Sequence, residues 1–233
     1  RAGAPAGAAP DDLLGRRSEA LQAGEVDLLV RILQPLALNE QAESIVALNA
    51  AGREVVSLTW DEEAKQYLMM TGGASFAHEP LVSRILVGGA DTVGDKYVGI
   101  VETSLGRILY TSSPVRTEQG ALAGVLLLGT RLDTLAHDLK TQANGDIVLR
   151  DNDGYLLATT LTDQAGYPPG FERVAPAAND YAATFKFRHN ERQYEMGYDP
   201  WTARQERLGY LGVALPSSFV VSAEATSRTG FSL

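Results

Sequence analysis

The stretch IVLRDNDGYLLA at residues 147–158 repeats, 102 positions later, the pattern of IVALNAAGREVV at residues 45–56. Each copy consists of two short apolar runs around a polar turn that contains a glycine, Gly52 in the first copy and Gly154 in the second. Apolar runs that flank such a turn predict a β-hairpin. The repetition therefore predicts two copies of one structural module.

The order of the segments after each hairpin supports the duplication. A connector of mixed character follows each hairpin, at residues 61–94 and 163–180, and three strand-like runs follow each connector. Pro114 near the end of one set corresponds to Pro200 in the other, 86 positions later instead of 102, so the second connector is the shorter. We expect an α+β fold with two five-stranded antiparallel sheets, each flanked by helices.

Two helices are predicted outside the modules. Apolar residues at helical spacing indicate a long helix over 11–34, which Pro35 ends or kinks, and a linker helix over 131–142. We therefore expect five parts, which are an N-terminal linker and long helix at 1–37, a first module at 38–130, a linker helix at 131–143, a smaller second module at 144–223, and a C-terminal tail at 224–233 that leads to a membrane helix beyond this fragment.

Composition narrows the function. The 233 residues carry a formal net charge of -9, which disfavours binding to nucleic acid or to an anionic membrane, since both attract clusters of Lys and Arg. There is no cysteine, so a disulfide framework and a thiolate metal site are excluded. The longest apolar run, residues 121–129, is far shorter than the ~20 residues that span a bilayer.

The sequence offers no catalytic or metal-binding pattern. His78, His137 and His189 are scattered, and neither an HExxH nor a GxSxG pattern occurs. The DNDG sequence at 151–154 lacks the alternating oxygen ligands of a calcium loop and fits a tight turn instead. We expect no catalytic residue, no metal and no cofactor.

Three segments carry a resemblance to a known family: IVALNAAGREV, YVGIVETSLGRILYTSSPV and LAGVLLLGTRLDTL, beginning at residues 45, 97 and 122. In their order, residues 11–223 resemble the double Cache family of PAS-like sensor domains. The resemblance implies an extracytoplasmic region of a bacterial transmembrane receptor that binds a small molecule in its first module. It also implies an output domain elsewhere in the protein, such as a kinase, a cyclase, a diguanylate cyclase or a chemoreceptor signalling helix.

The sequence departs from one branch of that family. Members that sense amino acids are similar in having an Arg-x-Trp-Tyr cluster before the third strand and an Asp after the fifth. Here Arg84 is not followed by Trp-Tyr, and Gly129 or Thr130 stands where the Asp is expected. The resemblance therefore does not imply an amino-acid ligand.

A ligand pocket is predicted between the first sheet and the connector that covers it, and the longer connector predicts the larger pocket in the first module. Strand alternation and the position of the connector indicate eight lining residues: Tyr97, Gly99, Tyr110, Ser112, Arg84, Arg116, Tyr67 and His78. Hydroxyl groups and a guanidinium fork suit a carboxylate or another small metabolite. The alternative is that the tyrosines pack in the core or face water and that the arginines lie on the surface.

A second hypothesis belongs to another class. The fragment is then a structural spacer without a ligand, and it forms a homodimer through a parallel seam of Leu14, Leu21 and Leu28 on the N-terminal helix. An apolar first module filled by side chains favours the spacer. A polar-lined cavity favours the sensor.

Overall fold

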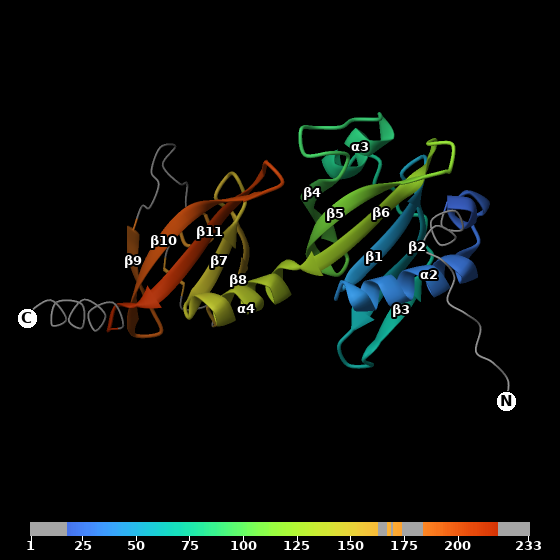
Figure 1. The fold of residues 1–233 in the computed structure, drawn as a ribbon. Helices are drawn as coiled ribbons and strands as arrows, with labels where there is room; N and C mark the ends of the chain where they lie inside the picture. The colour runs from blue at the N-terminus through green and yellow to red at the C-terminus, as the bar shows by residue number, and fades with distance from the viewer. Residues whose placement is uncertain (1–17, 163–166, 169, 174–183, 219–233) are drawn as a thin grey trace, which may run out of the picture. The chain divides into compact units, whose positions relative to one another are not determined.

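The computed structural model describes residues 18–162, 167–168, 170–173 and 184–218, and the chain divides into two compact units, Arg1–Thr130 and Arg131–Leu233 (Figure 1). Each unit is built on one antiparallel sheet, so the predicted α+β fold is confirmed. Among the described helices, none combines the length and the apolar character needed to cross a membrane.

The first unit contains a six-stranded sheet in the order β3-β2-β1-β6-β5-β4. Its strands are β1 (Ser44–Asn49), β2 (Glu54–Asp61), β3 (Gln66–Met70), β4 (Tyr97–Thr103), β5 (Gly106–Arg116) and β6 (Leu122–Arg131). The sequence predicted five strands, and β3 is the additional one. The carboxylate of Asp61 accepts hydrogen bonds from the backbone of Glu63 and Ala64 in a tight turn, after which β3 pairs with β2.

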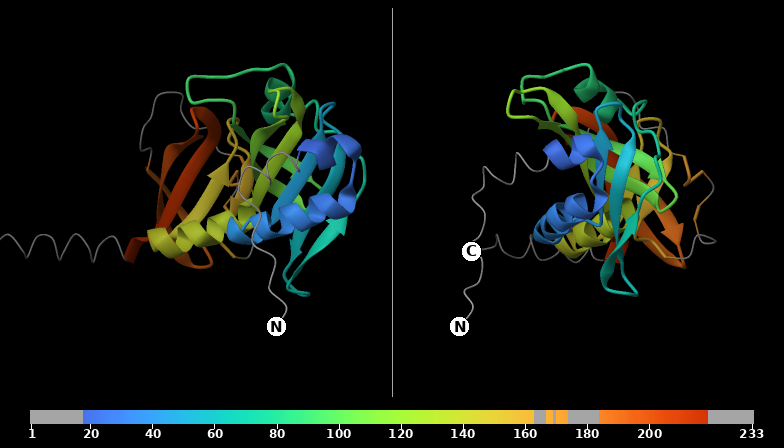
Figure 2. Two further views of the ribbon diagram at one scale, coloured as in Figure 1. Left: turned by 45° about the vertical axis from the view of Figure 1, so that its right-hand side comes forward. Right: turned by 90° about the vertical axis from the view of Figure 1, so that its right-hand side faces the viewer.

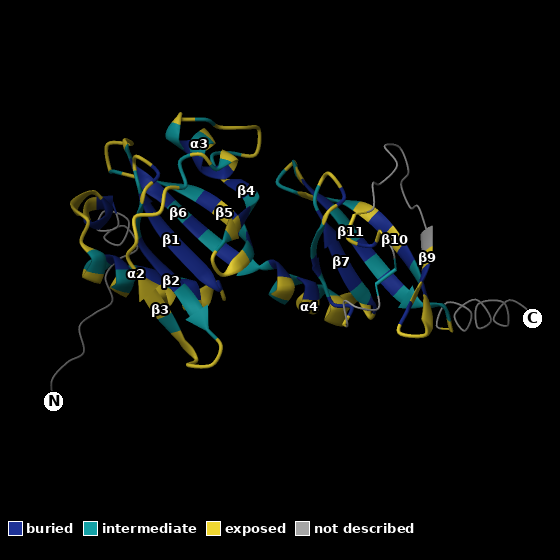
Figure 3. Cartoon of the chain, turned by 180° about the vertical axis from the view of Figure 1, so that it is seen from behind, coloured by how far each residue is buried: buried dark blue, intermediate teal, exposed yellow. Residues whose placement is uncertain are grey.

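Helices cover both faces of the first sheet. Helix α2 (Val26–Asn39) packs Leu29, Leu33 and Ala37 against one face, along which it lies in Figure 2. The short helix α3 (Pro80–Leu86) packs its buried residues against the opposite face. The central strand β1 is almost wholly buried as a result, whereas β3 at the sheet edge is mostly exposed (Figure 3). The face under α3 carries the site described below.

The N-terminal helix differs from the prediction. Residues 11–17 lie outside the described residues, and the remainder forms two helical segments, 18–23 and α2, because Gly24 adopts a left-handed conformation with φ of 68°. Pro35 was predicted to end or kink the helix, and it lies inside α2, so the helix does not end there. Its ring is exposed, and α2 continues beyond it because Ala37 is fully buried against the sheet.

Leu21 is buried and is not available for the predicted dimer seam. Leu14 lies outside the described residues, and Leu21 is only 3% exposed. The Leu21 side chain lies directly over Gly124 of β6, where even a Cβ atom would approach it to 2.4 Å. Leu21 therefore packs inside its own unit, and a seam that needs this side chain on the surface does not match the structure.

The second unit contains the linker helix α4 (Leu132–Ala143) and a five-stranded sheet in the order β8-β7-β11-β10-β9. Its strands are β7 (Asp146–Arg150), β8 (Leu156–Thr159), β9 (Thr184–His189), β10 (Arg192–Ala203) and β11 (Glu206–Pro216). Most of the predicted connector at 163–180, and the tail at 224–233, lie outside the described residues.

The duplication extends to an irregularity in the first hairpin of each unit. The pairing of β1 with β2 shifts register so that Leu48 faces Glu54, and the pairing of β7 with β8 shifts so that Arg150 faces Leu156. Both residues of the second pair stand 102 positions after those of the first. Each unit therefore has a β-bulge at the same place, and such a bulge changes the face on which the following side chain lies.

Candidate ligand-binding site

A cavity of about 250 Å³ lies in the first unit between the sheet and the covering connector. This is slightly below the range of ~300–1,000 Å³ that is common for ligand pockets, so it suits a small metabolite. Eleven of its seventeen lining residues have polar side chains, and the lining comes from five strands, from connector residues 74–79 and from the β4–β5 turn. The residues are Ser44, Val46, Glu54, Ser57, Thr59, Met70, Ala74, Ser75, Phe76, His78, Glu79, Val101, Glu102, Thr103, Ser104, Leu105 and Tyr110.

Ser44 and Tyr110 form the polar part of the cavity floor. Their hydroxyl oxygens lie 2.8 Å apart and share a hydrogen bond in which either group can donate, although β1 and β5 are separated by β6. Gly129 of β6 makes this contact possible, because a Cβ atom there would lie 2.5 Å from the Tyr110 ring. The missing side chain lets the ring reach across β6 to β1.

The Ser44–Tyr110 pair keeps hydrogen-bonding capacity for a ligand. Each residue is only 2% exposed, and together they carry two hydroxyl hydrogens. The bond between them uses one hydrogen, and among the described residues neither side chain has another hydrogen-bond partner. Burial raises the pKa of Tyr110 above its usual value, the Ser44 hydrogen bond lowers it, and the negative charge of Glu54 raises it further. The phenol therefore remains a neutral donor.

Glu54 reaches the cavity because of the β-bulge. Simple alternation along β2 would place it on the same face as Val56 and Leu58, which pack under α2. The register shift instead pairs it with Leu48, whose side chain belongs to the opposite face. Ser57 donates a hydrogen bond of 2.6 Å to one carboxylate oxygen of Glu54, which fixes the carboxylate at the cavity wall.

Two further carboxylates line the cavity, and both have basic neighbours. Glu79 lies 3.0 Å from Nε2 of His78, and Glu102 accepts a hydrogen bond of 2.8 Å from Nε of Arg107. Among the described residues Glu54 has no such partner. No Lys or Arg occurs among the described residues that line the cavity. The cavity lining therefore carries acidic side chains and no Lys or Arg among the described residues, and Glu54 is the carboxylate without a basic neighbour there.

Of the eight predicted site residues, Tyr110 and His78 line this cavity. Tyr97, Gly99 and Ser112 share the predicted sheet face, but α3 covers them. Ser112 donates a hydrogen bond of 2.7 Å to the carbonyl oxygen of Leu81, and a Cβ atom at Gly99 would meet the Leu81 side chain at 3.4 Å. The space that the glycine leaves is therefore filled by α3.

The other three predicted residues lie away from the cavity. Arg84 lies in the last turn of α3, and its guanidinium stacks over the Tyr97 ring at 5.4 Å from the ring centre. Arg116 lies at the end of β5, 3.8 Å from a carboxylate oxygen of Asp95. Tyr67 packs on the α2 side of the sheet and donates a hydrogen bond of 2.6 Å to the carbonyl oxygen of Ala42.

Ser44, Ser57 and Glu54 were not predicted as site residues. Ser44 and Ser57 are small hydroxyl residues inside otherwise apolar strands, a pattern that could have indicated a polar surface inside the unit. Glu54 could not be placed by strand alternation, since the bulge reverses its side. Among the described residues, no group of three or more acidic or histidine side chains is arranged to hold a metal ion.

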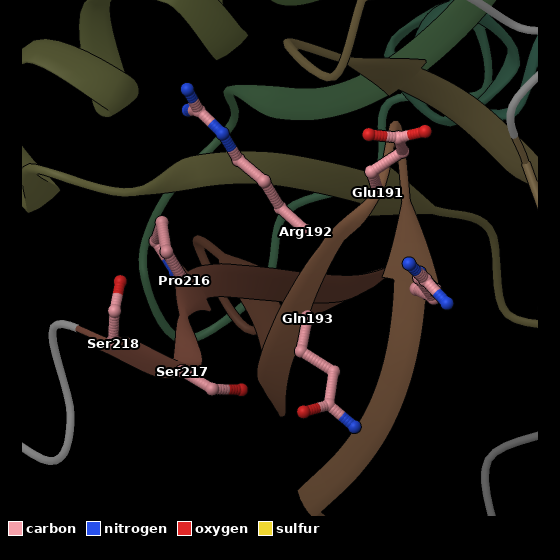
Figure 4. Close-up of a pocket in the computed structure, with 7 residues that line it drawn as sticks. Glu191, Arg192, Gln193, Pro216, Ser217 and Ser218 are labelled. Carbon is pink, nitrogen blue, oxygen red and sulfur yellow. The ribbon is translucent and has the colours of Figure 1, made fainter.

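The larger hollow lies in the second unit, so the prediction that the first module holds the larger pocket is wrong. A hollow of about 770 Å³ opens beside the turn between β9 and β10 and the end of β11, where Figure 4 shows Glu191, Arg192, Gln193 and Pro216. Its polar lining side chains are mostly exposed, so it is a surface depression. It does not lie between the sheet face and a covering connector.

The corresponding sheet face of the second unit is filled by its own side chains. Arg150 is fully buried and donates hydrogen bonds to the hydroxyl of Tyr198 at 2.7 Å and to the carbonyl oxygens of Phe171 and Gly154 at 2.6 and 3.1 Å. Its guanidinium also lies 5.0 and 5.5 Å from the ring centres of Phe171 and Tyr198. These contacts occupy the place that a ligand would need.

Comparison of the sequence with family models and with curated proteins finds no match. Solved structures do share the fold. A domain assigned to the sensory box/GGDEF family from Vibrio parahaemolyticus has a TM-score of 0.60 and 14% identity, and the similarity covers 89% of this chain and 87% of that one. The sensor domain of the histidine kinase DctB from V. cholerae has a TM-score of 0.55 and 16% identity, with 88% and 84% covered.

A chemoreceptor domain shares the fold as well. The ligand-binding domain of CtaA from Pseudomonas fluorescens, solved with L-serine, has a TM-score of 0.53 and 14% identity, and the similarity covers 89% of this chain and 86% of that one. These structures are sensory or ligand-binding domains of bacterial signalling proteins, in agreement with the resemblance carried by the sequence. The chain therefore shares the fold of these sensory and ligand-binding domains.

Proposed function

We propose that this chain is the extracytoplasmic small-molecule-sensing region of a bacterial transmembrane receptor and that the ligand binds in the cavity of the first unit. The observation that carries the proposal is the Ser44–Tyr110 pair, which leaves a hydroxyl hydrogen beside the cavity for which the described residues offer no acceptor. A buried donor without a partner is unfavourable by ~1–3 kcal/mol. A ligand atom or water that accepts from it removes this penalty.

Binding can be coupled to the rest of the unit through the elements around the cavity. Connector residues 74–79 form one wall and lead directly into α3, and β1 and β2 form the floor while α2 packs on their other face. A ligand that contacts both the connector and the floor favours the arrangement in which these two are close. Such differential affinity is what shifts a receptor between two states.

The proposal is tested by screening small metabolites for an increase in melting temperature. A ligand at 100 times its dissociation constant stabilises the folded state by ~2.7 kcal/mol. Thr59→Trp places a large ring in the cavity and should abolish the shift. Thr111→Trp is the matched control, because Thr111 lies exposed on β5 and outside the cavity lining. Both variants are first checked for a cooperative unfolding transition.

Two outcomes would count against the proposal. If no metabolite stabilises the protein, the spacer hypothesis is favoured. If a metabolite binds equally well to Thr59→Trp and to Thr111→Trp, the ligand site lies elsewhere. The proposal also includes an output domain, such as a kinase, a cyclase, a diguanylate cyclase or a chemoreceptor signalling helix. The sequence of the whole receptor identifies which of these it is.

A further inference from the structure

We infer that the ligand of the first-unit cavity is a small protonated amine that also carries a hydrogen-bond acceptor, with the ammonium bound by Glu54 and the acceptor bound by the Ser44–Tyr110 pair. This inference rests on the proposed function and specifies its ligand class. It also differs from the carboxylate that the sequence suggested beside other small metabolites. That prediction depended on Arg84 and Arg116, and both lie outside the cavity.

The charge of the cavity is the first argument. Three carboxylates line it, no Lys or Arg does so among the described residues, and the single histidine is already beside Glu79. The Glu102 carboxylate is held by Arg107, which leaves the charge of Glu54 to be balanced by the occupant. An anionic ligand would meet only repulsion at this wall. A cation would form a charge-assisted hydrogen bond with the carboxylate, which is the stronger kind of polar contact.

The position of Glu54 is the second argument. Glu54 lines the cavity, Ser57 donates to one of its carboxylate oxygens, and no described residue donates to the other. The β-bulge that turns this side chain away from the α2 face has a counterpart in the second unit, where the matching residue is Leu156. The backbone irregularity is therefore common to both units, but only the first unit uses it to present a charge.

The buried hydroxyl pair is the third and independent argument. Ser44 and Tyr110 are 2% exposed, and their mutual hydrogen bond leaves one hydroxyl hydrogen for the occupant. The occupant must therefore offer an acceptor, such as a hydroxyl, ether or carbonyl oxygen. Glu54 and Tyr110 both line the cavity, and the negative charge of Glu54 is one of the causes that raise the pKa of Tyr110, after burial. A single small ligand can contact both.

A metal ion fits these observations less well. A divalent cation needs several oxygen or nitrogen ligands gathered around one point, and the described residues contain no group of three that could supply them. The volume of about 250 Å³ is also much larger than one ion requires. An organic ammonium needs only one carboxylate and fills the remaining space with its carbon chain.

The test uses compounds that differ only in the charge at one end. Short-chain amino alcohols, the matching diols and the matching hydroxy acids are titrated into the purified chain by calorimetry, with 4-amino-1-butanol, 1,4-butanediol and 4-hydroxybutanoate as the first set. We expect binding to be confined to the amino alcohols. Glu54→Gln should weaken that binding by about 10- to 100-fold, since it replaces a charge-assisted hydrogen bond by a neutral one of similar shape.

The control variant addresses non-specific attraction. The chain has a net charge of -9, so any amine is attracted weakly to its surface. Glu118→Gln removes an exposed carboxylate outside the cavity lining and should leave the affinity unchanged. Tyr110→Phe, which deletes the acceptor-binding hydroxyl, should weaken the amino alcohols more than plain alkylamines of the same length.

The outcomes separate the two proposals. If only diols or hydroxy acids bind, or if Glu54→Gln binds amines as tightly as the unaltered chain, the amine inference is wrong while the sensor proposal stands. If compounds of all three classes fail to bind and a broader metabolite screen also finds no ligand, the sensor proposal itself fails. If Glu54→Gln and Glu118→Gln weaken amine binding equally, the attraction is non-specific and the inference is overturned.

Discussion

Leu48 in the first unit and Arg150 in the second occupy matching positions, 102 residues apart, and each stands at the register shift of its first hairpin. Both side chains are fully buried on the same side of their sheets. Leu48 contributes to an apolar core under α3, next to which the cavity remains open. Arg150 instead extends a guanidinium between Phe171 and Tyr198. The difference between Leu48 and Arg150 therefore helps to explain why this sheet face is filled by side chains in the second unit.

Arg150→Met should destabilise the second unit. The substitution keeps an apolar stem but leaves the carbonyl oxygens of Gly154 and Phe171 and the hydroxyl of Tyr198 without their donor. Buried acceptors that lose a partner typically cost ~1–3 kcal/mol each, and partial relaxation reduces the sum, so we expect a loss of about 2–5 kcal/mol. Urea unfolding measures this loss. Arg188→Met, at an exposed position on β9, should change stability by less than ~0.5 kcal/mol. Equal effects of the two changes would refute a special role for Arg150.

Gly129→Ala should damage both stability and ligand binding. The new Cβ atom would lie 2.5 Å from the Tyr110 ring and 2.6 Å from the Ile108 side chain, so the ring must move away from Ser44. Overpacking of this kind costs ~1–3 kcal/mol. Gly197→Ala is the matched control, since it lies in β10 with no atom within 4 Å of the added methyl. Thermal unfolding and ligand titration report the two effects, and a neutral result for Gly129→Ala would mean that the Tyr110 ring has another position.

Tyrosine ionisation should reduce stability at high pH. Burial is the main cause that raises the pKa of Tyr67, Tyr110 and Tyr198 above the ordinary value of 10.0, with Arg150 opposing the shift at Tyr198. A tyrosine whose pKa is higher in the folded state than in the unfolded chain stabilises the fold while it is neutral. This contribution is complete below the unfolded pKa of ~10 and is lost as the pH rises through the folded pKa. Absorbance titration should show these tyrosines ionising after the others. Tyr110→Phe should reduce the loss above this pH, and an unchanged pH dependence would argue that Tyr110 ionises normally.

Pro35→Ala should stabilise the first unit. Proline in a helix interior is less favourable than alanine by ~3 kcal/mol, and part of this is offset because proline also restricts the unfolded chain. Pro35 is exposed inside α2, so its replacement removes no buried contact. We expect a gain of about 1–2 kcal/mol in urea unfolding. Gln34→Ala, also exposed in α2, should give a much smaller gain. A loss of stability in Pro35→Ala would show that the ring helps to shape the helix.

Much of the fold could be predicted from local sequence. The apolar runs in IVALN and IVLRD, the glycines in the turns and the constant spacing of the two hairpins predicted two similar antiparallel sheets. The face of β4 and β5 that carries Tyr97 and Tyr110 was also predicted correctly, because it follows from alternation alone. The additional strand β3 was missed. Its existence depends on pairing with β2, which the short run at 66–70 does not reveal by itself.

The candidate site was only partly predictable, since two long-range arrangements decide it. Whether a residue on the correct face meets a ligand or a helix depends on where α3 packs, and α3 covers Tyr97, Gly99 and Ser112 while leaving Tyr110 in the cavity. Whether Glu54 faces the cavity depends on a β-bulge, which shifts alternation by one residue.

The sequence by itself therefore determined the repeated strand pattern, because strand periodicity and turn formation are local properties. Only the tertiary structure decided that Glu54 joins Ser44 and Tyr110 around one cavity. That assembly requires an irregular register in one hairpin and a glycine on β6 beneath the Tyr110 ring. Both requirements concern contacts between strands distant in the chain, on which residue spacing gives no information.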